Sequence, residues 1–344
     1  MSGQYNKMEY RKKFYPIGED LYRYLEIYSR VTKLPISYSD LLNYKEVIQL
    51  KSNGKKTLWN AVTYRPTEMI EITDGLVRLY QIINGNDIRI KHLYVGSIDF
   101  CSYGNSKPFR VKIINEINDN YDYLYIKRVD ASRVYGLELE DIFSPNKINY
   151  LIDKETIVEE HVIGIPGDQF IEEYEGGINN IDFVRLSKEF VKFNERCFVR
   201  LLGDMRSYNY VIVVTQDFDK IQYRIRAMDF DQQSFEGKKN IYFPQFFKDN
   251  FFFVEQVKCH ISQKTAEQYM SEERGLMRKR LLNEKNKFSD LIGVMKNDEI
   301  SEKENINLLK TELAIYYSDS AFNKAKSMAD ILVLNISNRL EIDI

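Results

Sequence analysis

Residues 196–236, RCFVRLLGDMRSYNYVIVVTQDFDKIQYRIRAMDFDQQSFE, decide the fold. An apolar run, Val211–Val214, is followed by the polar turn Thr215–Lys220 and by a second run that ends at Met228. Both runs are rich in β-branched and aromatic residues, and this pattern around a polar turn predicts a β-hairpin. The helix that we expect over residues 181–200 leads into this hairpin.

Three side chains with oxygen atoms flank the hairpin: Asp204 and Asn209 precede its first arm, and Asp229 follows its second. Because the two arms run antiparallel, the hairpin brings these residues to one end of the strands. Two carboxylates and a carboxamide suit a base for a hydroxyl group together with Mg²⁺, which takes hard oxygen ligands. Asp and Asn are also the usual residues of turns, so a purely structural turn is the alternative interpretation.

Composition and charge argue against several classes of protein. The chain has 344 residues, enough for one large domain or two ordinary ones, and its hydrophobic content of 44% is normal for a globular protein. A net charge of −2 argues against a dominant partner of nucleic acid or anionic membrane. No apolar run predicts a membrane span or a signal peptide. Three cysteines far apart in the sequence indicate a reducing compartment, so we expect a cytoplasmic protein.

The first 87 residues contain no chemistry that their pattern identifies. Helical spacing of apolar residues predicts helices over residues 19–31 and 67–84. The segment Ser37–Asp40 resembles a helix cap and predicts a further helix over Leu41–Leu50. We therefore expect a helical N-terminal extension over residues 1–87.

The pattern changes at residue 88. The predicted elements of the next part are strands over residues 88–100, 109–117, 123–127 and 156–163 and a helix over residues 131–143. A break at Ile165-Pro166-Gly167 follows, and the chain after residue 251 has mainly helical spacing. This order predicts a small antiparallel sheet with one helix over residues 88–165 and a mostly helical part over residues 166–344.

The order of these motifs resembles atypical members of the protein-kinase-like superfamily. It runs from a strand Lys and a helix Glu through a hinge to Gly203-Asp204, then Asn209, a strand pair and Asp229-Phe230-Asp231. These motifs are similar to those of the aminoglycoside-phosphotransferase, HipA-type and phosphoinositide 3-kinase-like groups. The resemblance implies an α+β, protein-kinase-like two-lobed fold, with the sheet as N-lobe, the helical part as C-lobe and the N-terminal extension added. It also implies ATP and Mg²⁺ as cofactors.

The resemblance gives a role to each of the three residues that flank the hairpin. Asp204 matches the catalytic-loop Asp, which orients or deprotonates the accepting hydroxyl. Asn209 and Asp229 match the pair that binds the metal ion. The expected reaction is therefore transfer of a phosphoryl group from ATP to a hydroxyl of an unknown protein or small-molecule substrate.

The same resemblance assigns further residues to nucleotide binding. Lys127 ends the strand over residues 123–127 and matches the Lys that grips the α- and β-phosphates. Glu138 or Glu140 matches its ion-pair partner, and the apolar neighbours of Glu138 favour that residue. Gly104 and Ser106 lie in a small polar loop where a phosphate-covering loop belongs. A solvated Lys and a plain β-turn are the alternatives for these two features.

The chain departs from the kinase pattern at two points. Leu202-Gly203 stands where a His or Arg usually precedes the catalytic Asp, and Asp231 replaces the last Gly of Asp-Phe-Gly. Arg206 either supplies a positive charge that some families place in this loop or is a solvated loop residue. These departures favour the alternative hypothesis, a catalytically inactive kinase-fold module (a pseudokinase) that binds a nucleotide or a protein. A third hypothesis is an interaction protein that binds no nucleotide.

Overall fold

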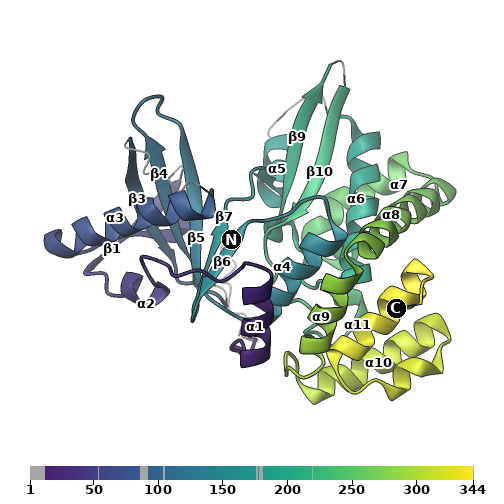
Figure 1. Cartoon of the computed structure of the whole chain (residues 1–344). Helices are drawn as coiled ribbons and strands as arrows, with labels where there is room; N and C mark the ends of the chain where they lie inside the picture. The colour runs from purple at the N-terminus through teal and green to yellow at the C-terminus, as the bar shows by residue number, and fades with distance from the viewer. Residues whose placement is uncertain are drawn as a thin grey trace. The chain divides into compact units, whose positions relative to one another are not determined.

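The computed structural model of this protein describes residues 12–52, 54–85, 92–103, 105–175, 177, 181–218 and 220–343. The chain divides into two compact units, and Figure 1 labels the helices and strands of each. The sheet unit comprises Met1–Ile17, Arg30–Asp130 and Asn149–His161, and the helical unit comprises Gly18–Ser29, Ala131–Ile148 and Val162–Ile344. The sheet unit therefore spans the boundary that the sequence pattern predicted between residues 87 and 88.

The sheet unit contains a seven-stranded antiparallel sheet with the strand order β1-β2-β3-β4-β5-β7-β6. Its strands are β1 (Glu46–Ser52), β2 (Lys55–Thr63), β3 (Leu93–Cys101), β4 (Phe109–Asn115), β5 (Tyr121–Arg128), β6 (Tyr150–Asp153) and β7 (Thr156–Glu160). The expected strands over residues 109–117, 123–127 and 156–163 are confirmed as β4, β5 and β7. The strand expected over residues 88–100 is confirmed as β3, and residues 88–91 lie outside the described part.

The prediction of a helix over Leu41–Leu50 is wrong. The Ser37 cap forms as a capping box with Asp40, but the helix that it opens, α2 (Tyr38–Leu41), has only one turn. The chain then enters β1, which forms a hairpin with β2 through Gly54 at φ 78°. Most side chains of β1 are exposed, so its ladder to β2 and not a buried face holds it in place. The first 87 residues are thus not purely helical.

One face of the sheet is covered by the helix α3 (Pro66–Ile83), which confirms the helix expected over residues 67–84. Leu76 and Leu79 of α3 share a hydrophobic core with Phe109, Val111 and Ile113 of β4. Because alternate residues of a strand point to opposite faces, the intervening residues of β4 lie on the other face of the sheet. Their half-buried side chains match this alternation.

The helical unit holds most of the helices and a second, three-stranded sheet with the order β10-β9-β8. Its elements are α1 (Glu19–Ile27), α4 (Ala131–Phe143), β8 (Ile165–Pro166), α5 (Gly167–Glu175), α6 (Phe183–Arg200), β9 (Tyr210–Asp217), β10 (Lys220–Ala227), α7 (Phe251–His260), α8 (Gln263–Asn283), α9 (Lys285–Met295), α10 (Lys303–Tyr317) and α11 (Met328–Leu340). The predicted hairpin is confirmed as β9 and β10. The whole chain is an α+β protein, as predicted. Among the described residues, no helix has the length and apolar character needed to cross a bilayer.

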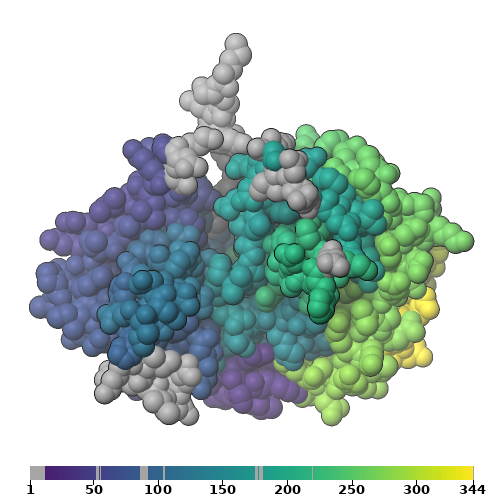
Figure 2. Space-filling model, turned by 90° about the horizontal axis from the view of Figure 1, so that it is seen from above, coloured from purple at the N-terminus to yellow at the C-terminus, as the bar shows by residue number. Residues whose placement is uncertain are grey.

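The N-terminal helix α1 belongs to the helical unit although it lies in the first 87 residues. It packs against α9, and the Tyr28 hydroxyl donates a hydrogen bond of 2.7 Å to Asp290 on α9. Figures 1 and 2 show the purple residues of α1 beside the light-green residues of α9. The first 87 residues therefore contribute to both units.

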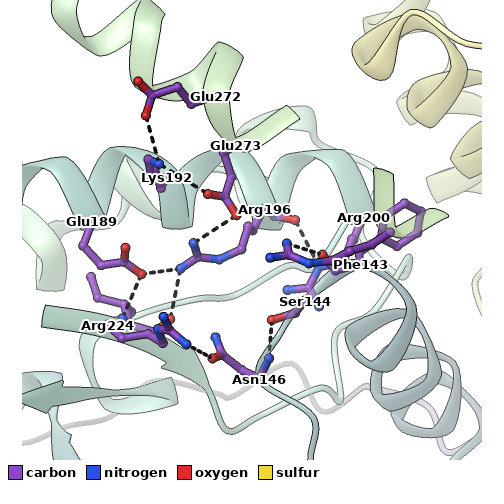
Figure 3. A network of polar contacts seen from close by, with 12 residues as sticks. Phe143, Ser144, Asn146, Glu189, Lys192, Arg196, Arg200, Arg224, Glu272 and Glu273 are labelled. Atoms are coloured by element: carbon purple, nitrogen blue, oxygen red, sulfur yellow. Dashed lines mark hydrogen bonds and ion pairs between the residues drawn. The ribbon is translucent and has the colours of Figure 1, made fainter. Parts of the chain in front are cut away.

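Helix α6 is the centre of the helical unit, and its buried charges tie it to several neighbours. Figure 3 shows Arg196 of α6 between Glu189 and Glu273, at 2.7 and 3.3 Å. Arg196 also donates to the Ile225 carbonyl of β10 at 3.1 Å, while Glu273 lies on α8. The end of α6, from which the loop of the candidate site emerges, is therefore fixed by charges inside the unit.

Candidate functional site

The loop that carries Asp204 begins where α6 ends, and its backbone is unusual. Leu201 and Asp204 have left-handed φ angles of 52° and 55°, a region that Asp tolerates better than most residues. Gly203 lies between them, and a Cβ there would be 3.1 Å from the Gln232 carbonyl oxygen. The Gly203 N–H donates to that same oxygen at 3.2 Å. The loop is thus held against the segment that follows Asp229.

Two residues of the same loop, Arg206 and Asn209, form hydrogen bonds with Asp204. Arg206 Nε donates to Asp204 Oδ1 at 2.8 Å, and Arg206 Nη1 donates to Asp249 at 3.0 Å. Asn209 Nδ2 donates to the Asp204 backbone carbonyl at 2.7 Å and lies 3.5 Å from Asp204 Oδ2. Asn209 therefore fixes the loop in which the carboxylate lies, and Arg206 orients the carboxylate itself.

Burial raises the pKa of Asp204 above its ordinary value. The hydrogen bond and charge of Arg206 lower this pKa in part, and the negative charge of Asp249 raises it. Burial, followed by the charge of Asp204, also raises the pKa of Glu236. Asp204 is therefore a carboxylate that takes up a proton more readily than an ordinary Asp, which is a property of a general base.

The hairpin joins Asn209 and Asp229 through its backbone. Tyr210 pairs with Ala227 in the β9–β10 ladder, and the Met228 N–H donates to the Asn209 carbonyl at 3.1 Å. Asp229 is the next residue after this bond, so the two segments meet at the same end of the hairpin. This placement agrees with the sequence argument, while the roles of Asn209 and Asp229 as metal ligands stay predictions.

Sequence reasoning missed the cation next to Asp229. Arg133 Nη1 donates to Asp229 Oδ1 at 3.0 Å and to Asp231 Oδ1 at 2.8 Å, and Arg133 Nη2 donates to the Met228 carbonyl at 3.3 Å. The Asp231 N–H donates to the same Asp229 Oδ1 at 3.0 Å. One signal in the sequence was available, since two carboxylates two residues apart after a strand with one buried face need a counter-charge when they fold inward.

The described residues near Asp229 do not form a ready-made divalent-ion site. No group of three or more His, Cys, Asp or Glu side chains in the described ranges is placed to hold a metal. Asp229 Oδ1 already accepts hydrogen bonds from Arg133 and from the Asp231 N–H. A Mg²⁺ ion at Asp229 would face the positive charge of Arg133, so the arrangement does not fit the ion in this conformation.

Two of the expected nucleotide contacts lie in the described part of the sheet unit. Lys127 on β5 is buried and forms an ion pair with Glu159 on β7, with Nζ and Oε2 2.9 Å apart. Ser106 is half-buried in the loop between β3 and β4, and Gly104 lies outside the described residues. The assignment of these residues to nucleotide binding stays a prediction.

The two candidate partners of Lys127 are on α4 in the helical unit, where both are buried. Glu138 forms an ion pair with Lys287 of α9 at 2.9 Å. Glu140 pairs with Arg200 at the end of α6. The expected ion pair joins residues of different units, so it stays a prediction, and within its own unit each glutamate has another cationic partner.

The comparisons with known proteins give no family. No protein-family model and no curated protein matches the sequence. Among solved structures, the autoinhibited serine kinase domain of the giant muscle protein titin matches at 10% identity over 73% of this chain and 82% of that chain, with a TM-score of 0.27. Rad53 in complex with AMP-PNP matches at 14% identity over 83% of this chain and 78% of that chain, with a TM-score of 0.26.

Proposed function

We propose that this protein is a kinase-like phosphotransferase that uses ATP to phosphorylate a hydroxyl group, with Asp204 as the residue that orients or deprotonates the acceptor. The observation that carries the proposal is the geometry of the Asp204 loop. Arg206 donates a hydrogen bond of 2.8 Å to the Asp204 carboxylate, and Asn209 donates one of 2.7 Å to the backbone carbonyl of Asp204. A carboxylate held in one orientation is what acceptor positioning requires.

Two further features support a functional loop over a plain turn. Asp204 has a positive φ of 55°, and non-Gly residues held in this region cluster at functional sites because the strain has to be maintained by the surroundings. The raised pKa of Asp204, which follows from burial, brings this carboxyl closer to the pH at which a base operates. The positive φ alone does not separate Asp204 from a solvated turn Asp, since the exposed turn residue Asp119 has a φ of 56°. Burial of the Asp204 carboxylate is the property that a solvated turn Asp lacks.

Nucleotide contacts by Lys127, Glu138, Gly104 and Ser106 belong to the proposal as implications of the resemblance. The same holds for a cytoplasmic location and for the acceptor, a hydroxyl of a protein or a small molecule. The resemblance also implies Mg²⁺, but Arg133 lies against Asp229 where the ion would bind. No step of the proposed reaction depends on the metal ion here. The residues of the chain would hold the acceptor hydroxyl and take up its proton at Asp204.

The second candidate is a kinase-fold module that does not catalyse transfer. One observation favours it: Arg133 lies against Asp229 and Asp231 at 3.0 and 2.8 Å. A guanidinium in that place competes with any cation that Asp229 would bind. Such a module would still bind a nucleotide or a protein partner.

The test is the variant Asp204→Asn. Asn keeps the size of the side chain and tolerates the left-handed backbone, so the loop should stay folded. If Asp204 acts as the base, ATP consumption should fall by roughly 10²–10⁴-fold, while calorimetric nucleotide affinity stays close to wild type.

Asp217→Asn is the matched control, because Asp217 is an exposed carboxylate at the opposite end of the same hairpin. It should keep both ATP consumption and nucleotide affinity. Wild-type protein that binds a nucleotide but consumes no ATP with any acceptor would favour the second candidate. Equal activity of Asp204→Asn and wild type would remove Asp204 from the reaction.

A further inference from the structure

Arg133 is placed where a cation would bridge Asp229 and Asp231. A single nitrogen, Nη1, lies 3.0 Å from an oxygen of Asp229 and 2.8 Å from an oxygen of Asp231. The Arg133 side chain is 1% exposed and that of Asp231 is 7% exposed, whereas that of Asp229 is 36% exposed. The guanidinium therefore occupies the inner side of the acidic pair, and Asp229 forms its outer side.

Helix stability does not explain an arginine at this position. Arg133 lies in the first turn of α4, which begins at Ala131. The N-terminal end of a helix carries partial positive charge, so a cation in the first turn is unfavourable for the helix itself. Arg133 does interact favourably with the carboxylates that follow β10, almost a hundred residues later in the chain.

A second contact fixes α4 against the same segment. Gly136 lies one turn after Arg133, and a Cβ at Gly136 would be 2.8 Å from Cβ of Phe230 and 3.2 Å from Cβ of Gln233. Only a residue without a side chain allows this close approach. Phe230 lies between Asp229 and Asp231 in the chain. The close packing of Gly136 on Phe230 therefore places the Arg133 guanidinium beside both carboxylates.

We propose that Arg133 is the built-in counter-ion of Asp229 and Asp231 and that it keeps this acidic pair from binding divalent cations tightly. The meaning of this role for catalysis rests on the proposed function, but the cation-binding behaviour does not. The Arg133 guanidinium offsets one of the two negative charges of the pair. A divalent ion that binds Asp229 must then compete with a positive charge held in place by α4.

The test is titration of the 344-residue protein with Mn²⁺ in the absence of nucleotide, with the free ion measured by electron paramagnetic resonance. Arg133→Met keeps the bulk of the side chain and removes its charge, and it should tighten Mn²⁺ binding by about tenfold or more, since a repelling charge at contact distance is gone. Arg133→Lys restores the charge and should return the affinity toward wild type. Asp229→Asn in the Arg133→Met background should abolish the gain.

Arg133→Met leaves two buried carboxylates together, so its folding is checked by circular dichroism. If it does not fold, the double variant Arg133→Met/Asp231→Asn removes one charge of each sign and should still bind Mn²⁺ more tightly than wild type through Asp229. Folded variants that bind Mn²⁺ no more tightly than wild type overturn the proposal. So does tight Mn²⁺ binding by wild type that Arg133→Met weakens. These outcomes are independent of ATP consumption, so they are distinct from failure of the proposed function.

Discussion

At the scale of single residues, Arg206 opposes the effect of burial on the pKa of Asp204. Burial raises the pKa of Asp204, and the hydrogen bond and charge of Arg206 act in the opposite direction. A base works in its charged form, so activity should fall as the pH decreases through the raised pKa of Asp204, at a pH above the ordinary Asp value of about 3.9. Replacing Arg206 by an uncharged residue removes the interaction that lowers the pKa of Asp204.

We therefore predict that Arg206→Met moves the acid limb of the turnover–pH profile to higher pH. The measurement is ATP consumption across the acid range for wild type and variant. Lys258→Met on α7 is the control, because Lys258 is an exposed cation paired only to its helix neighbour Glu255 among the contacts described, and its profile should not move. An acid limb that stays in place, or that moves to lower pH, would exclude Arg206 as the group that tunes Asp204.

At the scale of elements, the packing of α4 on the segment after β10 depends on one glycine. We predict that Gly136→Ala destabilises the protein by roughly 1–3 kcal/mol, because the added methyl overpacks a filled contact with Phe230. Gly293→Ala on α9 is the matched control, since no atom lies within 4 Å of its added Cβ. That change should instead stabilise the protein by roughly 0.5–1 kcal/mol, through higher helix propensity. Urea unfolding of both variants gives the comparison, and equal effects would show that α4 does not need the close contact.

At the scale of the whole molecule, each unit has its own interior, and both interiors combine apolar residues with buried charges. The sheet unit is held by an apolar core between α3 and the seven-stranded sheet. The helical unit adds buried charges around α6, with Arg196, Glu189 and Glu273 nearly enclosed. Removing one member of such a group leaves an unpaired charge in the interior, which costs more than the group contributes when it is complete.

We predict that Arg196→Met lowers the free energy of unfolding by roughly 3–5 kcal/mol, because it leaves Glu189 and Glu273 without this partner. Lys258→Met breaks an exposed ion pair with Glu255 and should cost roughly 0–1 kcal/mol. Thermal or urea unfolding of the two variants measures the difference. A small effect of Arg196→Met would mean that water or other cations replace the guanidinium readily.

The local pattern of the sequence determined the elements that stand on their own spacing. Helices α3, α4 and α6 and the β9–β10 hairpin follow from apolar periodicity and from a polar turn, because helix and strand periods are properties of neighbouring residues. The placement of Asp204, Asn209 and Asp229 at one end of the hairpin follows from the same pattern, since antiparallel arms have a defined geometry. Strand β1 was missed because its side chains are mostly exposed, and only pairing with β2 makes it a strand.

Only the tertiary structure decided which charges meet. Arg133 reaches Asp229 and Asp231 across almost a hundred residues of chain, and Arg206 reaches Asp249 across about forty. No periodicity records such contacts, because a charged side chain at a helix start or in a loop has the same local pattern whether it faces solvent or a buried carboxylate. The sequence by itself therefore determined the hairpin and the positions at which Asn209 and Asp229 flank it. Close packing, above all of α4 at Gly136 on Phe230, decided that Asp229 and Asp231 have Arg133 as a counter-ion, since burial makes an unpaired carboxylate costly.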